Sequence, residues 1–359
     1  ADHVPGTPST DVGSEIQAVA TSASDPCGAR TLCSRLCRNA SCCAMAASSG
    51  AVWAVSLMHP SLNEARRTDS ARVGAASYIR RMHAAPTLGL IIPPDQPPER
   101  FLPVARAAEQ AGVDEVWLWE DCFGQSGTST AAAVLAATER IRVGIGLMPV
   151  PLRNVALTAM EIATLGRMFP GRLLPGIGHG VLEWMAQAGV RAQSPLTLLA
   201  EQATALRTLL AGDELSVEGR YVRLDRVRLR WLPEPVPPLL IGGGKPKTLG
   251  LAGELGDGVI LAGDLTPDAD RSVTRDAIRV VRDARAAAGL GGAFDVVQFA
   301  GIRSDASVDE VSSFAVALGE LGVTSVPLIA LGPDGEPEAG DGILRLAATI
   351  GDAAREQAS

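Results

Sequence analysis

The chain has 359 residues, of which 47% are apolar, and this is enough for one large α/β domain or two medium-sized ones with a sizeable core. A net charge of −8 argues against a nucleic-acid-binding surface, and no stretch of about 18 apolar residues predicts a membrane span. We therefore expect neither nucleic acid nor a membrane as a partner, and we expect a cytoplasmic protein.

Residues 1–82 differ from the rest because they lack sustained hydrophobic periodicity. This segment holds five of the six cysteines, namely Cys27, Cys33, Cys37, Cys42 and Cys43. Clustered cysteines can bind zinc or form disulfides, but the spacing matches no paired CxxC pattern, and we expect no metal site. We interpret residues 1–82 as a poorly ordered extension or a mis-assigned start, with the functional domain at 83–359.

From Thr87 onward, apolar runs typical of buried strands alternate with helical periodicity. The predicted strands span residues 87–92, 115–119, 141–148, 172–178, 238–243, 258–263, 295–302 and 323–330. The predicted helices span residues 99–112, 129–140, 154–168, 194–212, 246–256, 266–289, 307–322 and 341–356. This alternation predicts a TIM (β/α)8 barrel, and an open doubly wound sheet is the alternative.

Residues 179–238 are predicted to be an insertion between the fourth and fifth strands. Its helix has Ser194 as the expected N-cap and Pro195 at the first helical position. The following segment alternates polar and apolar residues around Glu218 and Gly219, which predicts a β-hairpin. The insertion would decorate the barrel near the carboxyl ends of the strands, where the sites of such barrels lie.

Two glycine-rich turns follow the fourth and fifth predicted strands, GIGHG at 176–180 and GGGKPKT at 242–248. Consecutive backbone N–H groups and the start of a helix favour an anion such as phosphate. Lys245 and Lys247 are the only lysines among 32 basic residues, which suggests that their position matters. The alternative is a tight turn with solvated lysines, and we favour the phosphate site.

Four segments in this order carry a family resemblance, namely GVDEVWLWEDCF, ATERIRVGIGLMPVPLRNVALTAMEIATLGRMFPGRLLPGIGHG, LAGDELSVEGRYVRL and PPLLIGGGKPKTLGLAGELGDGVIL. With them, the chain from about Thr87 to its end resembles the luciferase-like flavin and deazaflavin oxidoreductases. It is most similar to their coenzyme F-420-dependent, methylene-tetrahydromethanopterin-reductase-like branch. The resemblance implies a TIM barrel with an insertion after strand four, a cofactor across the barrel mouth, and a homodimer.

The resemblance also implies site residues. A bulge with a non-proline cis peptide at Gly146–Leu147, next to Met148, would back the cofactor ring. Phosphate and ribityl contacts would come from Gly178, His179, Gly180, Gly242, Gly243, Gly244 and Lys245. Asp121 matches the acidic residue after strand two, so His179 and Asp121 are the expected catalytic residues. The chain has Cys122 where relatives carry a histidine, and His179 where some carry a glutamate, which leaves the acid and base roles open.

Each of these residues also has a structural interpretation. His179 could be an ordinary half-buried histidine, Asp121 could cap the next helix, and Cys122 could be a small core residue. Trp117 and Trp119 alternate along one strand and are expected in the core. Trp184 could line the pocket.

The resemblance implies an oxidoreductase that transfers a hydride between coenzyme F-420 and a small organic substrate. An FMN-dependent monooxygenase using molecular oxygen is the alternative within the family. A flavin-binding barrel without catalysis is the alternative of another class. Neither the substrate nor the proton donor follows from the sequence.

Overall fold

The computed structural model describes residues 85–358 except Asp264 and Ala339. These residues belong to one compact unit. The interpretation of residues 1–82 as an extension, and that of the clustered cysteines, lie outside the described residues. Within the described residues no helix is long and apolar enough to cross a membrane, and no group of three or more potential metal ligands occurs.

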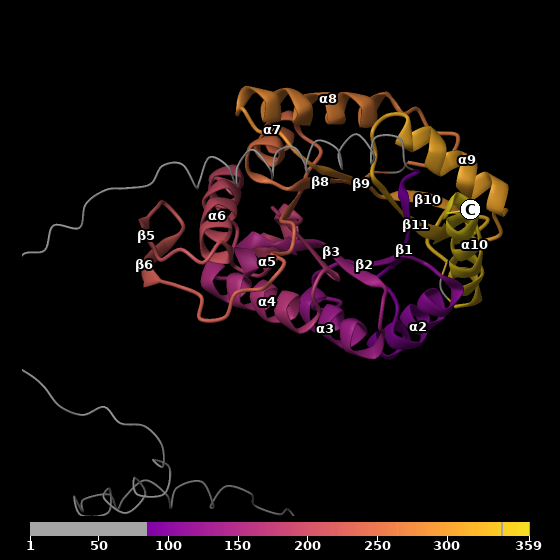
Figure 1. Cartoon of the computed structure of the whole chain (residues 1–359), viewed down its shortest axis with the longest axis horizontal. Coiled ribbons are helices and arrows are strands. Elements are labelled where there is room, and N and C mark those ends of the chain that lie inside the picture. The colour runs from indigo at the N-terminus through magenta and orange to yellow at the C-terminus, as the bar shows by residue number, and fades with distance from the viewer. Residues whose placement is uncertain (1–84, 264, 339, 359) are drawn as a thin grey trace, which may run out of the picture. The chain divides into compact units, whose positions relative to one another are not determined.

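A closed parallel barrel forms the centre of this unit (Figure 1). Its strands are β1 (Thr87–Ile92), β2 (Glu115–Leu118), β3 (Arg142–Pro149), β4 (Leu173–Gly178), β7 (Leu240–Gly242), β8 (Gly258–Leu261), β9 (Asp295–Gln298), β10 (Ala300–Arg303) and β11 (Ser325–Leu331). Only Phe299 separates β9 from β10, and both pair with β11. Because β1 pairs with both β2 and β11, the sheet is closed, and the predicted TIM barrel is confirmed.

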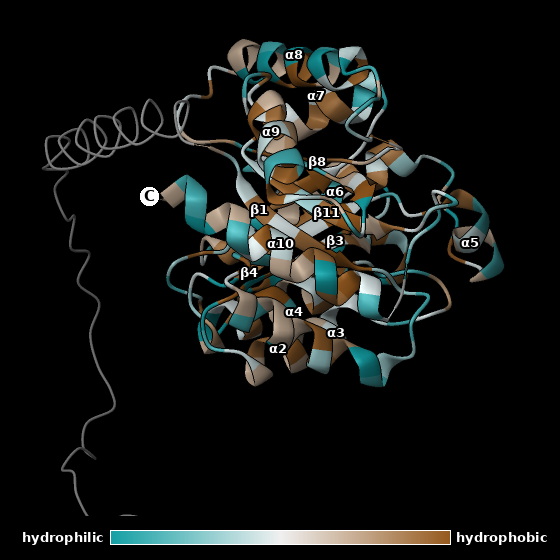
Figure 2. Ribbon diagram, turned by 90° about the vertical axis from the view of Figure 1, so that its right-hand side faces the viewer, coloured by the Kyte–Doolittle hydropathy of each residue, from teal (hydrophilic) through white to brown (hydrophobic). Residues whose placement is uncertain are grey.

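Helices surround the strands as an outer ring (Figure 1). They are α2 (Phe101–Ala111), α3 (Gly127–Ala137), α4 (Val155–Met168), α6 (Pro195–Leu210), α7 (Pro246–Leu255), α8 (Ser272–Ala287), α9 (Val308–Gly319) and α10 (Asp341–Ala358). Figure 2 shows hydrophobic residues along the strands and hydrophilic residues on outer turns of α8 and α10. Asn154 caps α4 as expected, since its side chain accepts the Ala156 N–H at 2.9 Å.

The insertion between β4 and β7 contains the short helix α5 (Leu182–Gln187), α6 and an antiparallel hairpin of β5 (Leu215–Glu218) and β6 (Arg223–Val227). The predicted hairpin is therefore confirmed. Glu201 on α6 holds its turn, because its carboxylate accepts the N–H groups of Tyr221 and Val222 at 2.8 and 2.9 Å. Ser194 occupies the N-cap position of α6 and Pro195 begins the helix, as expected, but the Ser194 hydroxyl lies 2.8 Å from the Thr197 hydroxyl and makes no capping hydrogen bond to the backbone.

Successive side chains along each strand point alternately outward and inward. The outward side chains form a hydrophobic layer beneath the helices, and the inward ones form a second cluster inside the barrel. The inner cluster consists of Ile91, Trp117, Leu174, Leu240, Ile260, Val297 and Phe299, with Trp119 and Ile329 packed against it. The Trp117 ring meets Phe299 edge-on at 5.3 Å, and Trp119 stacks on Phe299 at 6.2 Å. A column of three aromatic rings, packed among aliphatic side chains, therefore fills the barrel interior.

The base of this column is held by a buried carboxylate. Glu115 accepts hydrogen bonds from the Trp117 indole at 2.8 Å and the Ser325 hydroxyl at 2.6 Å, and it forms an ion pair with Arg142. Glycines make room beside the rings: a Cβ atom on Gly144 would overlap Trp117, and one on Gly146 would lie 2.5 Å from Phe299. The aromatic column thus requires glycine at alternate positions of β3.

We expect Gly144→Ala to destabilise the protein by about 2–3 kcal/mol, because the added methyl group would overlap the buried Trp117 ring. Urea unfolding would measure this. Gly250→Ala in α7 is a suitable control, since its Cβ atom would meet nothing within 4 Å, and it should be neutral or stabilising by about 0.5–1 kcal/mol. Equal midpoints for Gly144→Ala and the native protein would contradict this account of the barrel interior.

Candidate functional site

The two glycine-rich turns lie side by side at the carboxyl end of the barrel. Strand β4 pairs in parallel with β7, with Gly176 opposite Leu240 and Ile177 opposite Ile241. The turns after these strands are therefore neighbours. The His179 Nε2 atom lies 3.1 Å from the Thr248 hydroxyl in the first turn of α7, so a hydrogen bond joins the two turns.

His179 is held as a neutral imidazole. Burial is the largest effect and lowers the pKa of His179 below 6.5. The positive charge of Lys245 lowers it further, whereas the backbone carbonyl of Pro195 raises it. Its Nδ1 atom is buried and has no hydrogen bond of ordinary geometry in the described part of the chain. The ring is thus enclosed between Thr248 at Nε2 and buried surroundings at Nδ1.

The bulge expected in β3 is present and organises the strand ends around it. The register between β3 and β4 shifts between Ile145 and Met148, and the Gly146–Leu147 peptide bond is cis. The Leu147 side chain covers Gly178 and Gly242, where any Cβ atom would overlap it. Packing against Leu147 therefore explains why these two positions are glycine, apart from any ligand contact.

Fewer backbone N–H groups of the second glycine-rich turn are free to bind an anion than the sequence suggests. The Gly243 N–H donates to the Ile260 carbonyl at 3.1 Å, so it is not available to an anion. The N–H groups of Gly244 and Lys245, by contrast, make no hydrogen bond to any described residue, and nothing lies within 4 Å of a Cβ atom on Gly244. Both of these backbone groups lie where α7 begins, so they can bind an anion.

Two other residues of the expected site have restricted roles. Met148 is 1% exposed and belongs to the main hydrophobic core, which leaves only its backbone for a ligand. Gly180 has φ 68°, and its turn brings it against Pro149 and Met185. Glycine is needed there because other residues rarely adopt that conformation.

Asp121 lies in a separate open hollow of about 460 Å³ after β2, with Cys122, Phe123 and Leu157. Burial raises the pKa of Asp121, and no hydrogen bond or ion pair to its carboxylate occurs within the described residues. Ser126 caps α3, so Asp121 is not its cap. Burial also raises the pKa of the Cys122 thiol, and the charges of Glu120 and Asp121 raise it further. No hydrogen bond links Asp121 to His179.

Sequence reasoning missed the ion pairs that hold the β2 turn. Arg153 binds Glu120 through both guanidinium nitrogens, one of them at 2.9 Å, and binds Glu161 at 3.1 Å. Glu120 also accepts the Gly127 N–H at 2.8 Å. The only feature of the sequence that could have indicated the Glu120–Arg153 pair is the basic residue shortly after β3. Trp119 packs against the inner cluster as expected, although it is partly exposed and its buried indole N–H has no partner among the described residues.

A family model described as luciferase-like monooxygenase matches residues 79–355. The chain belongs to this family. The chain is 31% identical over 175 residues to a 5,10-methylenetetrahydromethanopterin reductase of Methanolobus tindarius, covering 49% of this chain and 53% of the relative. It is 31% identical over 177 residues to an F420-dependent glucose-6-phosphate dehydrogenase of Gordonia bronchialis, covering 45% and 52%.

These matches span about half the length of the curated relatives. Among solved structures, an F420-dependent secondary alcohol dehydrogenase in complex with an F420-acetone adduct superposes with a TM-score of 0.65 at 19% identity. This superposition covers 75% of the chain and 99% of the dehydrogenase, and it shows that the two share a fold. The luciferase-like barrel expected from the sequence is therefore confirmed.

The lowered pKa of His179 predicts how stability depends on pH. The unfolded chain binds a proton at this residue near pH 6.5, whereas the folded protein resists it, so stability falls as pH drops below about 6.5. His179→Ala should lose less stability than the native protein between pH 7.5 and 5.5. Urea unfolding midpoints at the two pH values measure this loss of stability. An equal loss in His179→Ala and in the native protein would show that His179 titrates normally in the folded state.

Proposed function

We propose that this barrel is an oxidoreductase that transfers a hydride between coenzyme F-420, a deazaflavin, and a small organic substrate. The observation that carries the proposal is the pair of open N–H groups at Gly244 and Lys245, next to a neutral His179. The relatives that share 31% identity support the choice of cofactor, since one is named F420-dependent and the other reduces a methylene-tetrahydromethanopterin.

The residues present fit the phosphate-bearing part of such a cofactor. The start of α7 supplies two unpaired N–H groups, and Lys245 adds a positive charge without an ion pair within the described residues. The bulge at Gly146–Leu147 would support the ring, whereas Gly178 and Gly242 are covered by Leu147 and Gly180 lies against Pro149 and Met185, so the open phosphate contacts would come from Gly244 and Lys245. When bound, the deazaflavin supplies the hydride chemistry, and the protein orients it and excludes water.

The protein's own contribution to proton transfer would come from His179. Its Nε2 atom is held by Thr248, and its neutral state leaves it able to accept or return a proton at the substrate. Asp121 is the second candidate, because its raised pKa and unpaired carboxylate are also suited to holding a proton. The two follow different strands, and residues from several strand ends can serve one site at the mouth of such a barrel.

An FMN-dependent monooxygenase is the second candidate, and the name of the family favours it. Binding measurements separate the candidates. We expect the purified protein to bind F-420 at least about tenfold more tightly than FMN, as followed by quenching of cofactor fluorescence. Tighter binding of FMN, with oxygen consumed by the reduced complex, would favour the monooxygenase. Binding of neither cofactor would refute the proposal, and binding without turnover of any alcohol or pterin substrate would favour a binding protein.

The two lysines offer a matched pair of variants. Lys245 caps α7 and its charge acts on His179, whereas Lys247 has no such effect on the site. Lys245→Gln should weaken F-420 binding by about 5- to 30-fold at low salt and make affinity less dependent on salt. Lys247→Gln should change affinity by less than about twofold. An equal loss of affinity in both variants would indicate a general electrostatic attraction of the cofactor. Unchanged affinity in both would mean that the phosphate binds elsewhere.

We also propose a homodimer in the cytoplasm. Leu157, Met160 and Met168 are exposed on α4, and Phe123, which is 72% exposed, lines the same hollow as Leu157. Exposed apolar side chains on one helix are typical of a contact surface. The free thiol of Cys122 suits a reducing compartment. Light scattering would test the dimer, which Met160→Glu should dissociate.

A further inference from the structure

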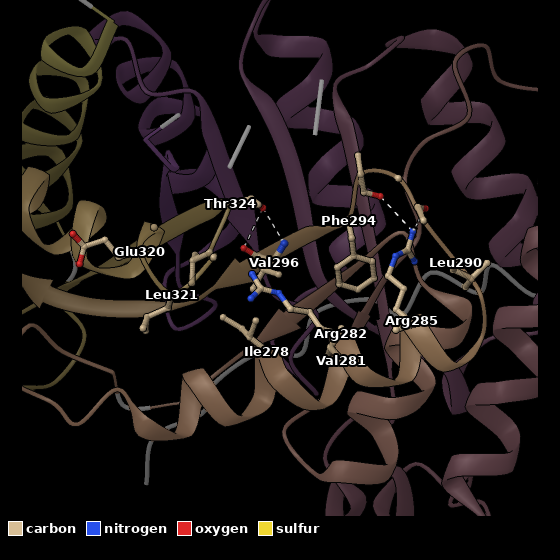
Figure 3. A pocket seen from close by; sticks show the side chains of 17 residues that line it. Ile278, Val281, Arg282, Arg285, Leu290, Phe294, Val296, Glu320, Leu321 and Thr324 are labelled. Atoms are coloured by element: carbon tan, nitrogen blue, oxygen red, sulfur yellow. Dashed lines mark hydrogen bonds between the residues drawn. The ribbon is translucent and has the colours of Figure 1, made fainter. Parts of the chain in front are cut away.

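A second cavity, of about 510 Å³, lies at the opposite end of the barrel from the candidate site. It is formed by α8, by the turn at 290–294 before β9, and by the turn at 319–324 before β11 (Figure 3). These turns lie at the amino ends of the strands, where neither His179 nor the glycine-rich turns reach. The volume falls within the range of about 300–1,000 Å³ that small-molecule sites occupy.

The walls of this cavity are mostly apolar. Ile278, Val281, Leu290, Phe294, Val296 and Leu321 point toward it (Figure 3). The Phe294 ring is fixed from one side, because the Arg285 guanidinium lies 4.7 Å from its centre. Arg285 is in turn held by the Gly291 and Gly256 carbonyls at 3.1 and 3.4 Å. The cavity therefore has a preformed apolar floor on which a ligand can pack.

A second arginine of α8, Arg282, supplies a charge at this cavity. Its guanidinium rests on Gly322, where a Cβ atom would overlap it, and Gly322 has φ 98°, which favours glycine. Arg282 makes no ion pair or hydrogen bond to another described residue. Arg279, one turn earlier on α8, lies near Asp276 and Asp283 at 3.5 and 3.7 Å. Arg279 therefore has carboxylates beside it and Arg282 has none among the described residues, although both arginines are exposed on the same helix.

From this arrangement we propose that the cavity binds an amphipathic monoanion, a carboxylate with an aliphatic body of medium chain length. The Arg282 guanidinium would bind the carboxylate, since its planar fork matches two carboxylate oxygens. The apolar walls would bury the chain. Glu320 is the one carboxylate among the lining residues and disfavours more than a single negative charge on the ligand. This site is separate from the proposed cofactor site and does not depend on it.

The experiment uses decanoate as the probe and decan-1-ol as its neutral counterpart, each titrated into the full-length protein by calorimetry below the micellar concentration. We expect decanoate to bind with one-to-one stoichiometry. Arg282→Gln should weaken decanoate binding by about tenfold and leave decanol binding unchanged, because only the charged head loses its partner. Arg279→Gln is the control and should change neither.

A second variant tests the location of the site. Ala286 lines the cavity from the exposed face of α8, so Ala286→Phe should fill the cavity without disturbing the core and abolish binding of both probes. Circular dichroism would verify that the variant folds, and Ala293→Phe is the substitute if it does not. Three outcomes would overturn the proposal: no saturable decanoate binding, an equal loss in Arg279→Gln and Arg282→Gln, or undiminished binding in a folded cavity-filled variant.

Discussion

The contact of one leucine with two glycines determines how the mouth of this barrel is built. Leu147 reaches across from β3 and lies on Gly178 of β4 and Gly242 of β7. The register shift in β3 places Leu147 there, and the absence of side chains at both glycines admits it. Three strand ends are thereby fixed relative to one another. His179 and Lys245 directly follow two of these strand ends, and the β4–β7 pairing and the His179–Thr248 hydrogen bond hold their turns together.

Below that contact, three aromatic rings and the aliphatic side chains packed with them fill the barrel interior. The charged and polar groups nearby fall into two sets. The buried Glu115 and the Glu120–Arg153 pair are fully engaged in holding strands and turns. His179, Asp121 and Lys245 are less constrained, because each has a nitrogen or carboxylate without a partner within the described residues. Groups committed to structure and groups without a partner are thus distinct at neighbouring positions of the barrel mouth.

The barrel and the pairing of its glycine-rich turns could be predicted from the sequence, because strand and helix periodicities are local and adjacent parallel strands end at the same edge. The reasons for individual glycines could not. Gly178 and Gly242 looked like parts of an anion site, but they face a leucine that precedes them by 31 and 95 positions. Likewise the burial of Met148, and the pairing of Arg153 with Glu120, arise from packing across different strands, which periodicity does not report.

The hydrogen bond between His179 and Thr248 has a consequence for where the imidazole carries its proton. A hydroxyl group can either donate to Nε2 or accept from it, so rotation about the Thr248 C–O bond selects the tautomer. With the hydroxyl donating, the proton lies on Nδ1; with the hydroxyl accepting, Nδ1 carries a lone pair. The ring can therefore carry its proton on either nitrogen without turning over and without changing its net charge. Such a group suits a reaction that runs in both directions.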